Sequence, residues 1–385
     1  MYHAARAMGF HIIGSDKNPQ AICRGLSDQF LNVSSRLQDK LLTVLGNEVL
    51  DAIVSPASDY GIMTAYNLGI YYGLGFGNSL LAAKSSTDKK FFNELMGKHG
   101  VRTPKCIKVV ERSDLKKSAE KIGYPLVLKP TDAAGGKGIT YIDDEAELNA
   151  AFEKAMKFSA SREAVVESYI EGVHYSSEWF RCGGKTVFGA TSMKVSDGSP
   201  SFLTIQHMIP APFDEDTERD VRETLDRVCD ICGVDNGPVN VDFIISEAGI
   251  YVIEMSARIS GNGFSNLIKE SYGIDNCMLS LQIAMGQPLF ELENARFKAN
   301  SALKVITSDS DGKFSEVSGL SKIKKHPAFI EECIFVKPGD MVRTYTNESH
   351  KLGYVIMAHP DLTVLKAGIK LVDTVLKIEY ISDAL

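Results

Sequence analysis

Long apolar runs and an excess of basic residues are both missing from this sequence. No stretch of about 18 apolar residues occurs, which argues against a membrane-spanning helix. The chain has 42 Lys and Arg against 49 Asp and Glu, for a net charge of -7. Proteins that bind nucleic acid or anionic membranes carry basic surfaces, so we expect neither partner and favour small molecules instead. The start also lacks the apolar core and cleavage site of a secretory signal, so we expect a cytoplasmic protein.

Cysteine forms no recognisable framework. The seven cysteines are scattered, and an odd number argues against a disulfide scaffold. Only Cys229 and Cys232 have a spacing that fits a redox or zinc site. They recur at helical intervals with Val221, Leu225 and Val228, and no second Cys or His pair stands at ligand spacing. We interpret the two cysteines as part of the buried face of a helix.

The first section, residues 1–86, also lacks a dinucleotide-binding G-x-G-x-x-G motif. Strands at 10–16 and 51–56 alternate with a helix at the start and another from Tyr60, which is typical of a parallel sheet. The chain opens inside a helix, so we expect the first strand of this domain to be missing from the sequence. Without the glycine motif, Asp16 is interpreted as a turn residue rather than a ribose-binding acid.

Two further sections follow, as expected for a chain of 385 residues. The second begins with a helix that Thr87 or Asp88 caps and Gly100 ends. The pattern then predicts strands at 124–130, 139–142 and 163–170, with a helix at 144–158. Around residue 298 a third section begins, with strands at 301–307, 341–345, 353–359 and 376–381 and a helix at 362–376.

Residues 240–258 predict a β-hairpin that holds two carboxylates opposite each other. Apolar residues alternate on both sides of a turn centred near Ala248. Asp242 and Glu254 are equidistant from that centre, so we expect them to be direct cross-strand partners about 5 Å apart at Cβ, where like charges repel. A nearby cation is therefore expected. An oxygen-only pair suits magnesium, which completes its shell with nucleotide phosphates.

The same strand continues with two more polar residues. Ser256 and Arg258 follow Glu254 at a period of two residues, so the pattern predicts that all three side chains share one face.

The stretch from Lys129 to Gly138 is glycine-rich and lies between two predicted strands. Gly135, Gly136 and Gly138 would let backbone N–H groups approach phosphate oxygens. It is not a Walker loop, because Lys137 is followed by glycine and a strand rather than by Ser or Thr and a helix. We interpret the loop as a lid over phosphates, with Lys129 as a point charge. A glycine-rich hairpin with solvated lysines would have the same pattern.

Three other polar sites leave alternatives open. Glu167 begins a strand-to-connector segment that suits an adenine edge, although such acids are usually solvated. His174 is either a substrate contact or a surface histidine. His207 faces substrate or is a partly buried histidine ahead of a turn.

Taken in order, Asp88-Lys89, LVLKP with GGKG, VVESYIEG, the VDF strand and IEMSARISGNG resemble the ATP-grasp superfamily. The resemblance implies an α/β chain with an α+β ATP-grasp domain at 87–297 and a lid at about 126–190. A Rossmann-like domain at 1–86 would precede it and a lid-like C-terminal domain at 298–385 would follow.

The resemblance also implies roles for individual residues. Lys89 and Lys129 would bind phosphates, with Gly135, Gly136, Lys137 and Gly138 over them. Glu167, Tyr169 and Ile170 would contact adenine, and Glu171 or a neighbour the ribose. Asp242 and Glu254 would hold one or two magnesium ions, with manganese as an option, and Arg258 would stabilise developing charge. Ser256 would be a third metal ligand, shorter and weaker than the Asn that the family usually has there, and His174 stands where the family often has Glu.

The third section resembles L-amino-acid ligases and glycinamide ribonucleotide synthetases. The resemblance implies an ATP-dependent carboxylate–amine (or thiol) ligase that forms an acyl phosphate and releases ADP and phosphate. Its substrates would be small acids and amines, and a homodimer is an option. The alternatives are carbamoyl-phosphate or carboxylase chemistry on bicarbonate, and a non-catalytic ATP-binding sensor or subunit.

Overall fold

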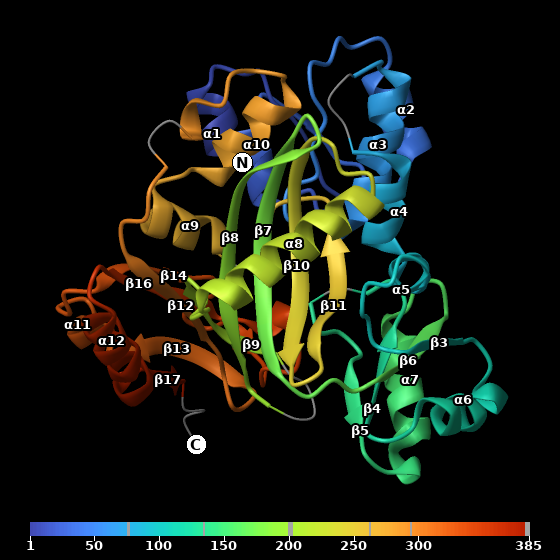
Figure 1. The fold of residues 1–385 in the computed structure, drawn as a ribbon. Coiled ribbons are helices and arrows are strands. Elements are labelled where there is room, and N and C mark those ends of the chain that lie inside the picture. The colour runs from blue at the N-terminus through green and yellow to red at the C-terminus, as the bar shows by residue number, and fades with distance from the viewer. Residues whose placement is uncertain (75–77, 134, 199–202, 262, 293–294, 382–385) are drawn as a thin grey trace.

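The computed structural model describes residues 1–74, 78–133, 135–198, 203–261, 263–292 and 295–381. Helices and several sheets are combined in one mixed α/β arrangement (Figure 1). The predicted α/β class is therefore confirmed.

An antiparallel sheet of eight strands forms the centre of the molecule (Figure 1). In spatial order its strands are β11 (Gly249–Ser256), β10 (Gly237–Ser246), β7 (Val173–Cys182), β8 (Lys185–Ser196), β9 (Thr204–Ile209), β12 (Asn300–Ile306), β16 (Gly353–His359) and β14 (Phe329–Ile334). The sheet thus combines strands from the second and third sections of the sequence.

The two faces of this sheet carry separate hydrophobic cores. Trp179 packs with helix α8 (Glu215–Ile231), whereas its neighbour Phe180 packs with α9 (Phe264–Tyr272) and α10 (Asn276–Ala284). Successive strand residues point to opposite faces, which explains the division. Cys229 and Cys232 are buried in the α8 core, so their interpretation as core residues is confirmed.

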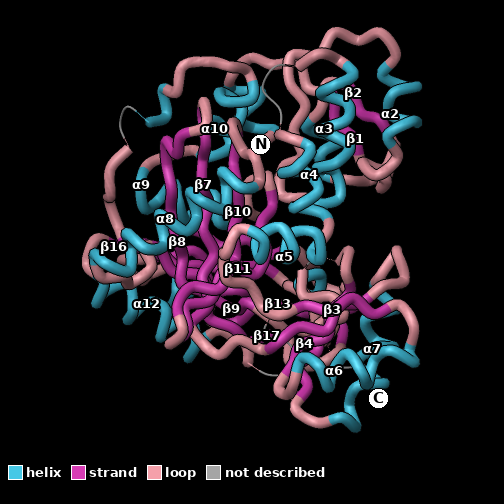
Figure 2. Tube along the Cα trace, turned by 45° about the vertical axis from the view of Figure 1, so that its right-hand side comes forward, coloured by secondary structure: helices cyan, strands magenta, loops and turns pink. Residues whose placement is uncertain are grey.

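A smaller four-stranded sheet lies beside the large one, at the opposite end of the molecule from α1 and α10 (Figures 1 and 2). Its antiparallel strands pack against α6 and α7 through Leu126, Leu128, Val166 and their apolar neighbours. In spatial order the strands are β3 (Cys106–Val109), β6 (Ala164–Ser168), β4 (Leu126–Pro130) and β5 (Thr140–Ile142), with α6 at Leu115–Ile122 and α7 at Leu148–Phe158.

The N-terminal section forms a two-stranded parallel sheet with helices around it. Its elements are α1 (Tyr2–Ala7), β1 (Ile13–Ser15), β2 (Gln29–Leu31), α2 (Gln38–Leu45), α3 (Ile62–Tyr71) and α4 (Leu80–Thr87). The predicted strand at 51–56 is wrong, because none of the described strands pairs with it and a strand requires a hydrogen-bonded neighbour. Helix α5 (Lys89–Lys98) follows, and Asp88 caps it by accepting from Phe91 N, as predicted.

The C-terminal section adds a three-stranded sheet and two helices around its own core. These are β15 (Met341–Val342), β13 (Gly312–Ser318) and β17 (Lys377–Tyr380), in that spatial order, with α11 (Leu320–Ile323) and α12 (Leu362–Val375). Short 3-10 turns connect elements at Ile22–Leu26, Asp59–Gly61, Arg112–Asp114, Glu145–Glu147, Phe290–Leu292 and Glu348–His350.

Candidate functional site

Asp242 and Glu254 lie opposite each other in the β10–β11 hairpin, as predicted. The centre of the turn and the register of the two strands, however, differ from the prediction. Ser246 pairs with Gly249, so the turn is centred between residues 247 and 248, and an extra residue at Ile253 then shifts the register. Without that β-bulge, Asp242 would face residue 253 instead. The bulge is therefore what brings the two carboxylates together.

Each of these carboxylates is paired with a lysine from a distant element. Lys89 Nζ lies 3.3 Å from Glu254 Oε2, and Lys194 Nζ on β8 lies 2.6 Å from Asp242 Oδ2. Ser176 Oγ on β7 also donates to Asp242 Oδ1 at 2.6 Å. The positive charge of Lys89, aided by the other nearby cations, lowers the pKa of Glu254 to about 2 although burial opposes the shift. In this structure each of the two carboxylates is thus balanced by a lysine, and the magnesium expected between them stays a prediction.

A third ion pair lies on the facing small sheet. Lys129 Nζ on β4 lies 2.7 Å from Glu167 Oε2 on β6, and both side chains are buried. Burial alone would lower the pKa of Lys129, but Glu167 and Glu254 outweigh it and the pKa is raised. Lys129 therefore stays charged at neutral pH.

These pairs line one cavity of about 210 Å³ between the two sheets, which we call the central cavity. It contains most of the residues that the sequence singled out. They are Lys89, Lys129, Gly135, Gly136, Lys137, Glu167, Tyr169, Ile170, His174, Asp242 and Glu254.

The glycine-rich loop closes part of this cavity and requires its glycines. Gly135 and Gly136 have φ of +70° and +73°, a conformation that L side chains rarely adopt. A Cβ at Gly136 would lie 2.3 Å from Leu203 Cδ2. The backbone N–H of Glu348, from the C-terminal section, donates to Gly135 O at 3.1 Å. The glycine-rich loop and a segment of the C-terminal section are therefore in contact at the central cavity.

Several predicted site residues lie outside the central cavity. Gly138 allows close packing, because a Cβ there would be 3.1 to 3.2 Å from Pro130 and Ala155. Glu171 is exposed and does not line the cavity. Ser256 lines a neighbouring cavity of about 190 Å³, which we call the side cavity.

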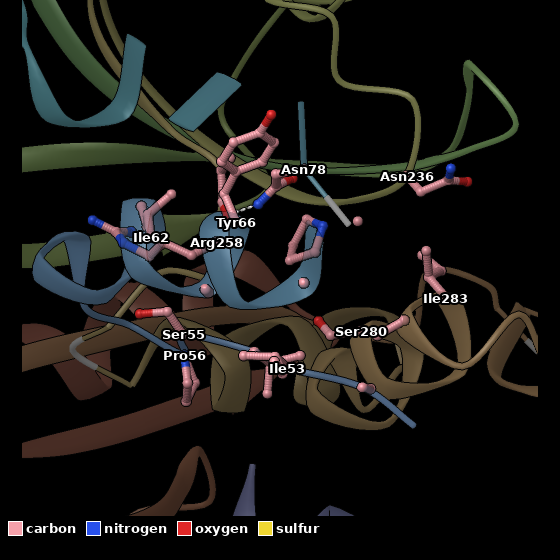
Figure 3. Close-up of a pocket in the computed structure, with 18 of the residues that line it drawn as sticks. Ile53, Ser55, Pro56, Ile62, Tyr66, Asn78, Asn236, Arg258, Ser280 and Ile283 are labelled. Carbon is pink, nitrogen blue, oxygen red and sulfur yellow. Dashed lines mark hydrogen bonds between the residues drawn. The ribbon is translucent and has the colours of Figure 1, made fainter. Parts of the chain in front are cut away.

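Arg258 lies beyond the end of strand β11 at Ser256, but its side chain reaches the face of the hairpin that carries the two carboxylates. Its partner Asn240 lies two residues before Asp242 on β10, and the charge of Arg258 helps to lower the pKa of Glu254. Arg258 Nε donates to Asp59 Oδ1 at 2.8 Å, and its Nη1 donates to Asn240 Oδ1 at 3.3 Å. Figure 3 shows it beside Ile62 on the wall of a third cavity, of about 260 Å³, that faces the N-terminal section.

The two histidines have different surroundings. His174 lines the central cavity, and burial, followed by the charge of Lys194, lowers its pKa. His207 is buried on β9, with Nδ1 2.9 Å from Ser192 Oγ and its ring edge-on to Phe264. Burial lowers the pKa of His207 to about 3, so it is neutral at pH 7.

The sequence reasoning missed four residues that contribute to the central cavity or its charges. Lys194, Thr204 and Glu348 line it, and Ser176 binds Asp242. The sequence signal for Lys194 was a single charged residue in the otherwise uncharged stretch TSMKVS. Its partner is 48 positions away in sequence, and only the pairing of β8 with β7 and of β7 with β10 brings the two together.

Comparisons with known proteins identify the class. Together, the opposed carboxylates, the lysines on facing sheets and the glycine-rich loop define the ATP-grasp superfamily, to which this chain belongs. A family described as "Carbamoyl-phosphate synthase L chain, ATP binding domain" matches residues 88–292, which is more than half of the chain, so the chain is a member of that family. "L-amino acid ligase C-terminal domain 2" matches residues 304–380.

Curated relatives are distant and longer. The chain is 25% identical over 289 residues to the uncharacterized protein y4rH of Sinorhizobium fredii, covering 73% of this chain and 59% of that protein. It is 28% identical over 262 residues to the N-terminal section of the carbamoyl phosphate synthase large chain of Methanopyrus kandleri, covering 66% and 45%. The chain therefore spans about half the length of these relatives.

Among solved structures, the L-amino acid ligase from Bacillus licheniformis is similar in fold. The TM-score is 0.84 at 21% identity, over 99% of this chain and 95% of that chain. In the described part of this chain, no helix is both long and apolar enough to span a membrane.

Proposed function

We propose that this chain is an ATP-dependent ligase that joins a carboxylate to an amine or thiol through an acyl phosphate. The observation that carries the proposal is the central cavity, where two opposed carboxylates and three lysines meet under a glycine-rich loop. Such an arrangement suits the triphosphate of ATP, because the lysines offset phosphate charge and the loop offers backbone N–H groups.

In this structure each of the three lysines forms an ion pair with a carboxylate rather than with a phosphate group. Lys89, Lys129 and Lys194 are held by Glu254, Glu167 and Asp242. When a nucleotide binds, we expect Lys89 and Lys194 to turn to phosphate oxygens and so release the two hairpin carboxylates. In this proposal Tyr169 and Ile170 contact the adenine, Glu167 its amino group, and Glu171 or a neighbour the ribose.

The released carboxylates fit magnesium. Asp242 and Glu254 offer only oxygen donors, and in the described residues no group of three or more His, Cys, Asp or Glu forms a complete metal cage. Magnesium commonly takes one or two protein carboxylates and completes its shell with water and phosphate oxygens. Bound there, it would neutralise charge on the β- and γ-phosphates. Manganese also prefers oxygen ligands and is the alternative metal for this site.

The proposed reaction needs no covalent protein nucleophile. An oxygen of the substrate carboxylate attacks the γ-phosphorus, and the bond to the bridging oxygen of ADP breaks. The amine then attacks the acyl carbon, phosphate leaves with the bonding electron pair, and the amine loses a proton. Arg258, held by Asp59, would face charge at the acyl phosphate after a small rearrangement of that ion pair.

The comparisons support this reaction in general terms. The C-terminal section matches the L-amino acid ligase domain, and the B. licheniformis ligase has the same fold. The proposed activity is tested by incubating the protein with ATP, magnesium, hydroxylamine and a panel of carboxylic acids. Hydroxamate and ADP should form together with at least one acid. ATP binding without hydroxamate from any acid would favour a non-catalytic nucleotide sensor.

A second candidate is chemistry on bicarbonate, because the matching family and several relatives are named for the carbamoyl phosphate synthase large chain. Bicarbonate-dependent ADP release in the absence of any amine or other acid would favour it. Dependence on an organic acid would favour the ligase.

A further inference from the structure

The side cavity adjoins the proposed phosphate site directly. Its walls include Lys89, Ala133 and Glu254, all of which also line the central cavity. Ser256, the last residue of β11, lines only the side cavity. A molecule in the side cavity therefore lies within reach of groups that would hold the γ-phosphate.

Another part of the lining of the side cavity comes from the N-terminal section. Arg36, Asp59 and Tyr60 line it, and the guanidinium of Arg36 lies 3.8 Å from the centre of the Tyr60 ring. Stacking on an aromatic face orients a guanidinium and leaves its N–H donors available at the edge.

Most charged side chains around the side cavity already have partners. Lys89 is paired with Glu254, and Asp59 with Arg258. Asp132 accepts from the backbone N–H groups of Ala160 and Ser161.

Arg36 differs from these groups, because no carboxylate of the described residues lies within ion-pair distance of it. Arg36 thus brings to the side cavity a guanidinium that holds no carboxylate of the described residues.

We propose that the side cavity binds the acid substrate, and that this acid carries a second anionic group that Arg36 binds. The inference rests on the proposed ligase function and names the substrate class, a small dicarboxylate. One carboxylate would lie beside Lys89 and Ser256, where it is phosphorylated, and the other would reach the guanidinium of Arg36. A planar guanidinium matches a carboxylate in a bidentate fork, which would discriminate a diacid from its neutral monoamide.

The test compares glutarate and succinate with their monoamides, which have nearly the same shape and one negative charge fewer. For the wild-type protein, kcat/KM for ADP release should be at least about tenfold higher with one diacid than with its monoamide. In Arg36→Gln the KM for the diacid should rise by about that factor, and the KM for the monoamide by a clearly smaller one. Lys40→Gln, an exposed cation on α2 outside the cavity, is the matched control and should behave like wild type.

Calorimetric titration of the same diacids without nucleotide separates this inference from the proposed function. Diacid binding that is lost in Arg36→Gln would support the site even if no ADP were released, and only the ligase proposal would then fail. Equal use of diacid and monoamide by the wild type, or an unchanged preference in Arg36→Gln, would overturn the inference. Absence of both diacid binding and diacid-dependent turnover would also overturn it.

Discussion

Glu178 is a buried acid that forms no ion pair with another of the described residues. It is fully buried on β7, and both of its carboxylate oxygens accept from the backbone N–H of Ser260, at 3.0 and 2.9 Å. Ser260 lies two residues after Arg258, so Glu178 holds the segment that carries this arginine. Burial raises the pKa of Glu178 to about 8, although the Ser260 N–H and Arg258 oppose the shift.

This raised pKa predicts a pH dependence of stability. Between the ordinary pKa of 4.5 and the raised value of about 8, the folded chain holds a proton that the unfolded chain has released. The free energy of unfolding therefore receives a contribution that falls as pH rises through this window. Glu178→Gln removes the titration, so its urea midpoint should gain on that of wild type between pH 5 and pH 8. A constant difference between the two proteins across this range would contradict the assignment.

For individual residues, the local sequence pattern predicted the two hairpin carboxylates but not the side chains that bind them. The hairpin that carries Asp242 and Glu254 was predictable because its strands are close in sequence, whereas the β-bulge that sets their register was not. Lys194 and Ser176 were not predictable either, because their contacts with Asp242 depend on the order in which the three strands β8, β7 and β10 assemble. The ion pair of Arg258 with Asp59 was also not predictable, because Asp59 is 199 positions away in the sequence.

Among the elements, the β7–β8 pair depends on a glycine opposite a tryptophan. Gly189 faces Trp179, and a Cβ at Gly189 would lie 2.4 to 2.7 Å from atoms of the indole ring. The indole is buried and its Nε1 donates to Asp226 on α8 at 3.0 Å. The glycine therefore lets one strand pair accommodate the side chain that ties α8 to the sheet.

Gly189→Ala should displace this ring and destabilise the fold by about 1 to 3 kcal/mol, as overpacking does in a dense core. Trp179 is the only tryptophan in the sequence, so its fluorescence emission should shift to longer wavelength while the urea midpoint falls. Gly97→Ala on α5 is the control, because a Cβ there meets nothing within 4 Å, and it should be neutral or slightly stabilising. Unchanged emission and midpoint in Gly189→Ala would contradict this packing.

Elements with a strong local signal were predicted well. Helices α5, α7, α8 and α12 and strands β4, β5, β6, β12 and β16 lie where periodicity and capping indicated. The segment at 51–56 has the composition of a strand but pairs with none of the described strands. Its composition alone was therefore not enough to predict a strand. Strands β7 to β9 were not individually predicted, because their mixed polar and apolar residues serve both a core and a cavity.

On the scale of the whole molecule, the central cavity exists only where separate regions meet. The small sheet contributes Lys129 and Glu167, the large sheet contributes Lys194, Asp242 and Glu254, and the C-terminal section contributes Glu348. The ATP-grasp class was predictable from the order of the motifs. The division at 1–86, 87–297 and 298–385, the lid at about 126–190 and a homodimer stay predictions.

The central claim, that the hairpin carboxylates hold the metal of a phosphoryl-transfer site, is tested most directly by acid-dependent ADP release from Glu254→Gln in the presence of magnesium. The substitution keeps the size of the side chain and removes the charge that would hold the metal. Glu247→Gln, in the exposed turn of the same hairpin, is the matched control. We predict that Glu254→Gln loses ADP release with an unchanged urea midpoint, whereas Glu247→Gln retains it. Wild-type turnover by Glu254→Gln would contradict the claim.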